Sequence, residues 1–416
     1  MSIFRNIHDS LQDICFVWRE EMKQVFKDEG VIIFFFVVPL IYPLLYSWIY
    51  NNEKWEEVPV VVVDHSHSAL SRKFVRMCDA SPDVKVAFYA QDMDEAKSLI
   101  SRQLVRGIYY FPADFDVNVC RLQQATVGVY CDMSLMLGYK AVFQTAQMVS
   151  MEMGKQIKTK LGRNYTAREE AISTQPLAVD DVPLFNPSGG YGSFILPGVL
   201  MLILQQTLAL GIGLSAGTTR EESRYGWLVP LSRHYNGTLR IVLGKALCYF
   251  MIYAVIAAWL VAGVPRLFHF PQLAEWWPLM VIMFPYLLAC IFFGMTMSCM
   301  VKYRENVMLL MVFVSVPLLF MAGASWPQSN IPGFWQGVSW LFPSTFGVRA
   351  YIRLNSMGAS LQDVAQEYRI LWVHVFVYFV AACAVYRYQI HLARKHKNER
   401  LTELRQNKAA REQEKA

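Results

Sequence analysis

The stretch YGSFILPGVLMLILQQTLALGIGLSA, from Tyr191 to Ala216, decides what kind of protein this is. It contains no Asp, Glu, Lys or Arg, and as a helix it is long enough to cross a hydrocarbon core of about 30 Å. Further charge-free runs cover residues 30–52, 246–265, 276–301, 306–348 and 370–386. Together these runs exclude a soluble globular enzyme and predict a membrane protein with several spans.

Two of the charge-free runs are longer than a single crossing requires. The run 182–219 opens with Pro183, Pro187 and a Ser-Gly-Gly cluster, which favour a connecting loop. The run 306–348 is interrupted by prolines, so we expect one span followed by a segment that enters the membrane and returns, marked by Pro327, Pro332, Trp335 and Pro343. The predicted spans are residues 30–50, 191–216, 246–264, 277–301, 307–324 and 370–388, and the predicted re-entrant segment is 325–348.

Residues 1–29 have the pattern of an amphipathic helix, because Ile7, Leu11, Ile14 and Trp18 recur at helical spacing. A span follows directly, so we expect this helix to lie on the membrane surface. Packing against another protein is the alternative.

Residues 51–187 have the composition of a separate domain. Strand-like runs at 58–63, 84–89, 107–111 and 125–130 alternate with helical patterns, and a long helical pattern closes the region at 135–160. Such alternation predicts a small α/β layer structure. The expected fold class is an all-α transmembrane bundle of six helices with an inserted extracytoplasmic α/β domain.

The positions of the basic residues set the expected orientation. With both termini cytoplasmic, 20 Lys and Arg lie in the inner segments and 4 in the short outer segments. Basic residues favour the cytoplasmic side, whereas long domains translocate regardless of charge. Residues 51–187 are therefore expected outside, and 389–416 form a basic cytoplasmic tail. The net charge of +6 largely reflects this asymmetry, so no nucleic-acid partner is needed. The basic tail is expected to be solvated or to face the lipid bilayer.

We find no catalytic constellation in the sequence. Gly237 to Lys245 departs from the spacing of a nucleotide-binding loop, so no cofactor is expected in this chain. His65 and His67 beside Asp64 could touch a metal, but a polar turn explains them as well, and no metal site is predicted. Within the spans, Gln205 and Gln206 are costly polar residues. They either form hydrogen bonds between helices or line a transport pathway.

The stretch 217–240, between the second and third spans, is short, charged and expected to be cytoplasmic. A docking surface for a partner explains both its charges and the apolar residues that follow them. The candidate coupling residues are Glu221, Glu222, Arg224, Gly226, Pro230 and Arg233.

This stretch, with Pro230-Leu231-Ser232-Arg233 and the re-entry at Leu243-Gly244-Lys245, resembles the coupling loop of the type-two ABC exporter permeases. Val60 to Arg72 is similar to the opening strand of that family's outer domain. Phe111 to Phe115 is similar to its Pro-x-x-Phe element, followed by the acidic strand end Asp132-Met133-Ser134. Trp326 to Arg349 is similar to the family's outer re-entrant segment, so the resemblance covers nearly the whole chain in order.

The resemblance implies a permease subunit in the inner membrane of a bacterium. It would pair with a second copy or a paralogue, and a separate cytoplasmic ABC ATPase would bind ATP and Mg. The pair would move a hydrophobic or amphipathic compound, such as a drug or lipid, out of the cytoplasm or inner leaflet. The outer domain would either gate the transport pathway or dock a periplasmic adaptor that leads to an outer-membrane channel.

Two other classes of function are open to the sequence. An ATP-independent receptor or scaffold would use the outer α/β domain to bind a ligand or partner. An enzyme acting on lipid would need paired acid and base residues, which the spans lack.

Overall fold

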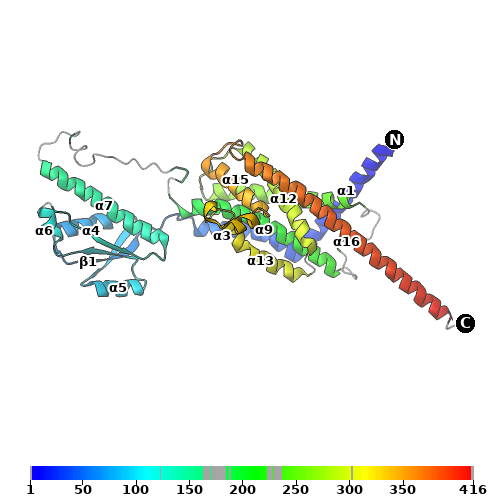
Figure 1. The fold of residues 1–416 in the computed structure, drawn as a ribbon, viewed down its shortest axis with the longest axis horizontal. Coiled ribbons are helices and arrows are strands. Elements are labelled where there is room, and N and C mark those ends of the chain that lie inside the picture. Colours follow the sequence, from blue (N-terminus) through cyan, green and yellow to red (C-terminus); the bar gives the residue numbers. More distant parts are fainter. Residues whose placement is uncertain are drawn as a thin grey trace. The chain divides into compact units, whose positions relative to one another are not determined.

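The computed structural model describes residues 2–121, 123–162, 169, 184–186, 189–222, 228, 237–300 and 303–413. The chain divides into two compact units. The bundle unit joins Met1–Asn51 with Phe185–Ala416, and the sheet unit is Asn52–Leu184 (Figure 1).

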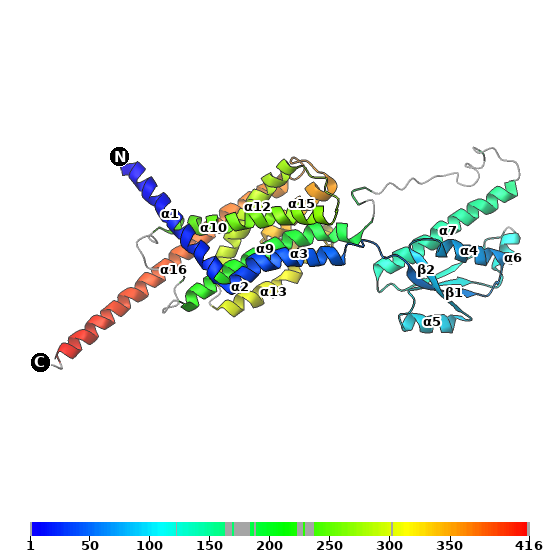
Figure 2. The ribbon, with the colours of Figure 1, turned by 180° about the vertical axis from the view of Figure 1, so that it is seen from behind.

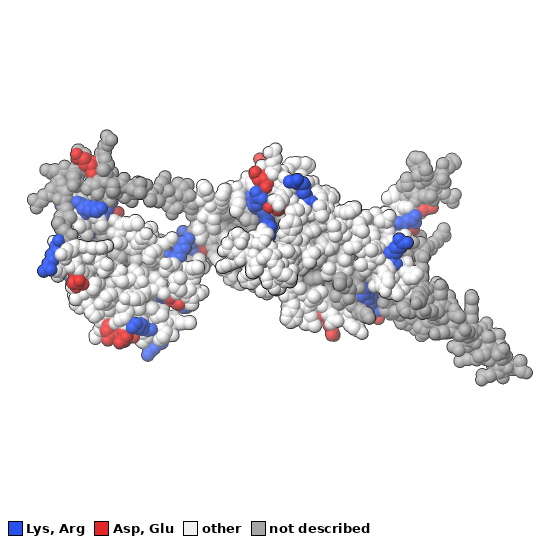
Figure 3. Space-filling view, in the orientation of Figure 1, with Lys and Arg blue, Asp and Glu red and all other residues white. Residues whose placement is uncertain are grey.

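Among the described residues, six helical stretches of the bundle unit are long and apolar enough to cross a membrane. These are Glu29–Ile49, Tyr191–Glu222, Thr238–Leu267, Trp276–Ser298, Arg304–Met321 and Ala365–Leu392. Each overlaps one predicted span, so an apolar helix of sufficient length stands at each predicted place, in the predicted order. On the face seen in Figure 3, the charged side chains of the bundle unit lie toward its two ends and leave its middle uncharged. This distribution suits a hydrocarbon core.

Two of the six stretches are composite helices. The first contains α2 (Glu29–Ile32), a π-helical turn (Ile33–Val37) and α3 (Val38–Ile49), and the third contains α10 (Thr238–Ala258), a π-helical turn (Trp259–Gly263) and α11 (Val264–Leu267). The others belong to α9 (Tyr191–Glu222), α12 (Trp276–Met300), α13 (Arg304–Met321) and α16 (Ala365–Gln413).

Helix α9 is the centre of the bundle unit. In its most apolar window 83% of residues are buried, against 24% in α13 and 22% in α16. Glycine makes this burial possible, because a Cβ at Gly211 would lie 1.9 Å from the ring of Phe35 and one at Gly213 would lie 2.3 Å from Val307. Close helix approach through small residues is typical of membrane bundles. The apolar side chains that α13 and α16 leave exposed suit contact with lipid.

The helix that contains the second predicted span continues past it. We expected the span to end at Ala216 and a loop or helix to follow over 217–240, and α9 continues to Glu222. The hydroxyl of Thr219 donates to the carbonyl of Ser215 at 2.7 Å and accepts a hydrogen bond from Gln24 of the N-terminal helix α1 (Ser2–Lys27). The predicted stretch 217–240 therefore begins as helix, and its last residues open α10.

The segment 325–348 forms short helices: a 3₁₀ turn (Gln328–Asn330), α14 (Gly333–Ser339) and the start of α15 (Pro343–Met357). The amide of Gln336 donates to the carbonyls of Gln328 and Ile331, each at 2.9 Å. Helix α15 packs on α9, α12 and α16. A returning path through the membrane stays a prediction for this segment.

The sheet unit contains four strands in the order β2-β1-β3-β4. Strand β1 (Val58–Asp64) is parallel to β2 (Val84–Ala90) and β3 (Gly107–Phe111), and β4 (Gly128–Cys131) is antiparallel to β3. All four were predicted, although β4 starts three residues later than expected. Its helices are α4 (Ala69–Asp79), α5 (Met93–Ser101), α6 (Phe115–Cys120) and α7 (Met136–Gly162). Helix α6 was not predicted, because six residues are too few to show helical periodicity.

Alternation along β1 builds a three-layer unit. Val58, Val60 and Val62 pack toward α4 and α7, while Val61 and Val63 pack toward α5. Figure 1 shows α5 on one face of the sheet and α4, α6 and α7 on the other. Both faces of β1 are buried, as parallel strands between helices require.

Two of the stretches that resembled a known family have structural roles here. The rings of Phe111 and Phe115 meet edge to face at 5.4 Å in the core below α6. The Asp132 carboxylate, just after β4, accepts hydrogen bonds from the Ser134 amide at 2.9 Å and Arg106 at 2.8 Å. The hydrogen bonds with Ser134, and then that from Arg106, lower the pKa of Asp132 to about 2. Asp132 therefore fixes the end of β4 as an ionised group.

Candidate functional site

Helix α1 packs along α10 and buries one stripe of its surface (Figure 2). Val17, Glu21, Val25 and Asp28 are buried at helical spacing. Gly244 of α10 permits the close approach, because a Cβ there would lie 2.8 Å from the Cβ of Val17 and 2.9 Å from the carbonyl oxygen of Ile14. We expected the apolar stripe of residues 1–29 to face lipid, but from Val17 onward it faces the protein's own bundle.

Glu21 is the most enclosed acid of this contact. Its side chain is 4% exposed, and Lys245 Nζ lies 2.5 Å from its Oε2. The Tyr249 hydroxyl donates to Oε1, and the Ser215 hydroxyl donates to the same oxygen at 3.4 Å. Since a buried charge is tolerated only when it is paired and hydrogen-bonded, these contacts fix α1 against α9 and α10 together.

Asp28 makes the second junction, where α1 meets the first span. Its Oδ1 accepts from the Gly30 amide at 2.9 Å, which caps α2, and from Arg304 Nη2 at 3.0 Å. Its Oδ2 accepts from the Thr218 hydroxyl at 2.5 Å. Asp28 therefore joins α2 to the end of α9 and the start of α13.

A third pair, Asp13 with Arg240 at 2.5 Å, lies nearer the N-terminus. We call the three pairs the ion-pair seam, and its members are Asp13–Arg240, Glu21–Lys245 and Asp28–Arg304. The pairs link α1 and the residue that follows it to α10 twice and to α13 once. The hydroxyls of Ser215 and Thr218 add α9, because they donate hydrogen bonds to Glu21 and Asp28. A displacement of α1 would therefore reach α9, α10 and α13 through bonded contacts.

The sequence interpretation missed this seam. It gave no role to Asp13, Glu21 or Asp28, and it named Lys245 only as part of the re-entry at Leu243-Gly244-Lys245. One signal was present, because Glu21 falls among Trp18, Met22 and Val25 on the apolar stripe. An acid within an apolar stripe, with a lone Lys opening an apolar run elsewhere, indicates a buried pair.

The predicted coupling residues are only partly within the described chain. Glu221 and Glu222 are exposed in the last turn of α9, and the Glu221 carboxylate accepts from the Arg304 amide at 3.3 Å. Arg224, Gly226, Pro230 and Arg233 lie outside the described residues. Leu228 is 1% exposed and belongs to the bundle core, so packing within this chain explains its apolar character.

The two glutamines of α9 differ in their surroundings. Gln205 is buried, and its Oε1 accepts from the Ser344 amide of α15 at 2.6 Å, which is a bond between helices. Both amide atoms of Gln206 are buried without a hydrogen-bond partner among the described residues. Of the two candidates for lining a pathway, Gln206 is therefore the one whose amide donor and acceptor have no partner among the described residues.

The four residues predicted to mark the re-entrant segment stand mainly at helix starts. Pro327 precedes the 3₁₀ turn, Pro332 precedes α14, and Pro343 is the buried first residue of α15. Trp335 lies within α14 and is half exposed. Proline is favoured at such positions because a backbone N–H at a helix start has no partner within the helix, so proline loses no hydrogen bond by lacking one.

Within the described residues, no group of three or more His, Cys, Asp or Glu side chains could hold a metal ion. His65 and His67 are exposed in the turn after β1, where the Asp64 carboxylate accepts from the amides of Ser66 and His67, each at 3.0 Å. The structure therefore accounts for Asp64 as a turn-forming residue.

Comparison with known proteins agrees with this architecture. The family model described as ABC-2 family transporter protein matches residues 30–384, which covers all but the ends of the chain. No curated protein matches the chain. The match, the six apolar helices and their order lead to one assignment: the chain is a multi-pass membrane protein that belongs to the ABC-2 family of transporter proteins.

Proposed function

We propose that this chain is the permease subunit of an ATP-driven exporter that moves a hydrophobic or amphipathic compound outward. A separate cytoplasmic ABC ATPase would bind ATP and Mg, and a second copy or a paralogue would complete the pathway. Family membership supports the permease role and an ABC ATPase partner. The buried, largely apolar α9 supports an apolar or amphipathic cargo.

The observation that carries this proposal is the ion-pair seam. An ATPase that closes on ATP must move the spans, although it contacts only the surface of the permease. Helix α1 is suited to receive this motion, because buried charged contacts at Glu21 and Asp28 tie it to α9, α10 and α13. Such contacts have discrete arrangements and do not stretch continuously, so motion of α1 would shift the spans between defined states.

In the proposed orientation, both termini, α1 and the stretch 217–240 are cytoplasmic, and the sheet unit is outside. The excess of Lys and Arg in the segments that join these elements supports this orientation. A bacterial inner membrane, a periplasmic adaptor docked on the sheet unit and an outer-membrane channel would complete the route.

The test replaces Glu221, Glu222, Arg224 and Arg233 together by Ala in the protein purified with its co-purifying ATPase. If these residues couple the subunits, permease-dependent ATP hydrolysis in liposomes falls about tenfold or more, which corresponds to roughly 1.4 kcal/mol of activation free energy.

The matched control replaces Asp94 and Lys97, an exposed pair on α5 of the sheet unit, and should leave hydrolysis unchanged. Unchanged hydrolysis in the fourfold variant, with the ATPase still bound, would remove these residues from the coupling surface.

A further inference from the structure

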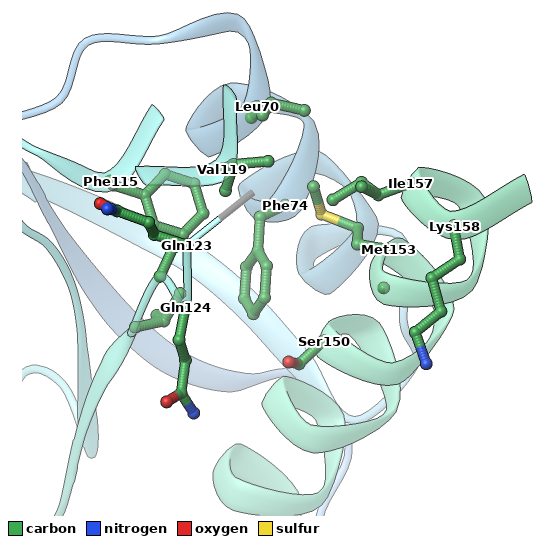
Figure 4. A pocket seen from close by; sticks show the side chains of 13 residues that line it. Leu70, Phe74, Phe115, Val119, Gln123, Gln124, Ser150, Met153, Ile157 and Lys158 are labelled. Atoms are coloured by element: carbon green, nitrogen blue, oxygen red, sulfur yellow. The ribbon is translucent and has the colours of Figure 1, made fainter. Parts of the chain in front are cut away.

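The sheet unit contains a cavity of about 460 Å³ between α4, α6 and α7 (Figure 4). The volume is within the range of small-molecule sites, roughly 300–1,000 Å³. Most of its wall is apolar and comes from these three helices: Leu70, Phe74, Phe115, Val119, Met153 and Ile157. Phe74, Phe115 and Met153 are also core residues of the unit, so the cavity borders directly on the hydrophobic core.

One side of the cavity is polar. In Figure 4 the ring of Phe74 lies in the middle, with Leu70, Val119 and Ile157 on one side of it. The polar ends of Gln124, Ser150 and Lys158 lie on the other, and the amide of Gln123 lies apart from them at the left of the view. A cavity divided in this way matches a molecule with an apolar body and a polar head.

The charge at the polar side is positive. Lys158 has no ion-pair partner among the described residues, and α7 carries Lys155, Lys158 and Lys160 with no acid after Glu152. Glu152 accepts from the Gln156 amide, and Gln156 accepts from Lys73 of α4. The unpaired Lys158 ammonium therefore favours an anionic head group.

Gly154 gives a second, independent indication. It lines the cavity within α7, and a Cβ built there would meet nothing within 4 Å. Glycine inside a helix is unfavourable relative to alanine, and no close neighbour in the described structure requires it here. The cavity is therefore open beside Gly154, and a side chain larger than a methyl group at this position would enter it.

We propose that this cavity binds an amphipathic small molecule with an apolar body and a carboxylate or phosphate head, and that Lys158 pairs with the head. Both free fatty acids and lipid-derived phosphates have this chemistry. The site does not depend on the exporter proposal, because binding here needs neither ATP nor an ATPase.

The experiment uses the full chain in lipid nanodiscs and three diazirine-bearing probes of equal medium chain length. These are a fatty acid, the corresponding alkyl phosphate and the corresponding alcohol. After photolysis, peptide mass spectrometry locates the labelled residues. We expect both anionic probes to label the walls formed by α4, α6 and α7, and the alcohol to label them several-fold less. A preference between carboxylate and phosphate then distinguishes a fatty acid from a phosphate-bearing lipid as the source.

Gly154→Leu fills the cavity, and we expect it to reduce labelling by about tenfold or more, the loss expected when ligand contacts are displaced. Gly154→Ala is the matched control and should keep labelling while it favours the helix. Lys158→Glu should reduce labelling by the anionic probes about three- to tenfold and leave the alcohol unchanged. Lys155→Glu makes the same charge change on the same helix outside the cavity and should have little effect.

Equal labelling of the Gly154→Leu and Gly154→Ala proteins would overturn the site, as would labelling confined to the bundle unit. Equal labelling by the alcohol and the anionic probes would overturn the role of Lys158. A different result would indicate that a protein docks here instead of a small molecule. In that case no probe would label the cavity, but a protein in native membranes would cross-link to it, and Gly154→Leu would block that cross-link.

Discussion

At the scale of the residue, burial decides which charges matter. The sequence drew attention to the charges of 221–233, because they stand between spans. The structure adds Glu21, whose carboxylate is enclosed with Lys245, Tyr249 and Ser215. A buried ion pair contributes little net stability, but removing one partner leaves the other charge uncompensated. Its main effect is to hold α1 in one position.

The first residue-scale prediction concerns this pair. Glu21→Ala should cost about 3–5 kcal/mol of the free energy that holds α1 on the bundle, because Lys245 stays buried without its partner. Hydrogen exchange of the α1 amides in the purified protein would report this as a loss of protection of about a hundredfold or more. Glu21→Leu combined with Lys245→Met should restore most of the protection.

Glu20 provides the control, since it is the adjacent residue of the same helix and forms an exposed pair with Lys23. Glu20→Ala should cost at most about 0.5 kcal/mol. Similar effects of Glu20→Ala and Glu21→Ala, or a double variant as unprotected as Glu21→Ala, would contradict a buried coupling pair.

At the scale of the element, helix α1 is neither an independent surface helix nor a span. Its apolar spacing predicted an amphipathic helix, and the structure confirms the helix over Ser2–Lys27. Its packing partner, α10, could not be predicted from that spacing, because the same stripe suits lipid, another protein or the same chain. Gly244 allows α10 to be the partner, since only a residue without a Cβ admits α1 at this distance.

The element-scale prediction is that Gly244→Leu displaces α1 from α10. The new side chain would overlap Val17 and the backbone of Ile14, and such overpacking costs typically about 1–3 kcal/mol. Exchange protection of α1 should fall while that of α9 and α12 is retained. Leu247→Ala, on an exposed side of α10, is the control and should leave α1 protected. Full protection of α1 in the Gly244→Leu protein would show that this contact does not hold the helix.

At the scale of the whole molecule, the chain combines a bundle for a hydrocarbon solvent with a sheet unit of ordinary soluble construction. The two have separate cores and belong to separate compact units. The distribution of basic residues predicts that they occupy different compartments, with the sheet unit outside the cell membrane.

Two exposed cysteines test this orientation. Cys120 lies in the sheet unit and Cys15 in α1, and both are free and exposed. The variants have a single cysteine, either Cys120 or Cys15. A membrane-impermeant maleimide should label Cys120 in intact spheroplasts and Cys15 only after permeabilisation. Labelling of Cys15 in intact spheroplasts would reverse the proposed orientation.

The sequence by itself determined the six long apolar helices, the order of the strands and longer helices of the sheet unit, and the family resemblance. These depend on composition and local periodicity, which are properties of consecutive residues in the chain. It did not determine the end of α9 at Glu222 or the short helix α6. The former depends on contacts with α1, and the latter is too short to show a period.

Only the tertiary structure decided which polar residues act together. Asp13, Glu21 and Asp28 find partners 227, 224 and 276 positions away in the sequence, and no local pattern specifies such pairs. The cavity beside Gly154 likewise exists only because α4, α6 and α7 meet on one face of the sheet. Solvent preference is a property of each segment, whereas a paired charge or a cavity is a property of segments brought together by folding.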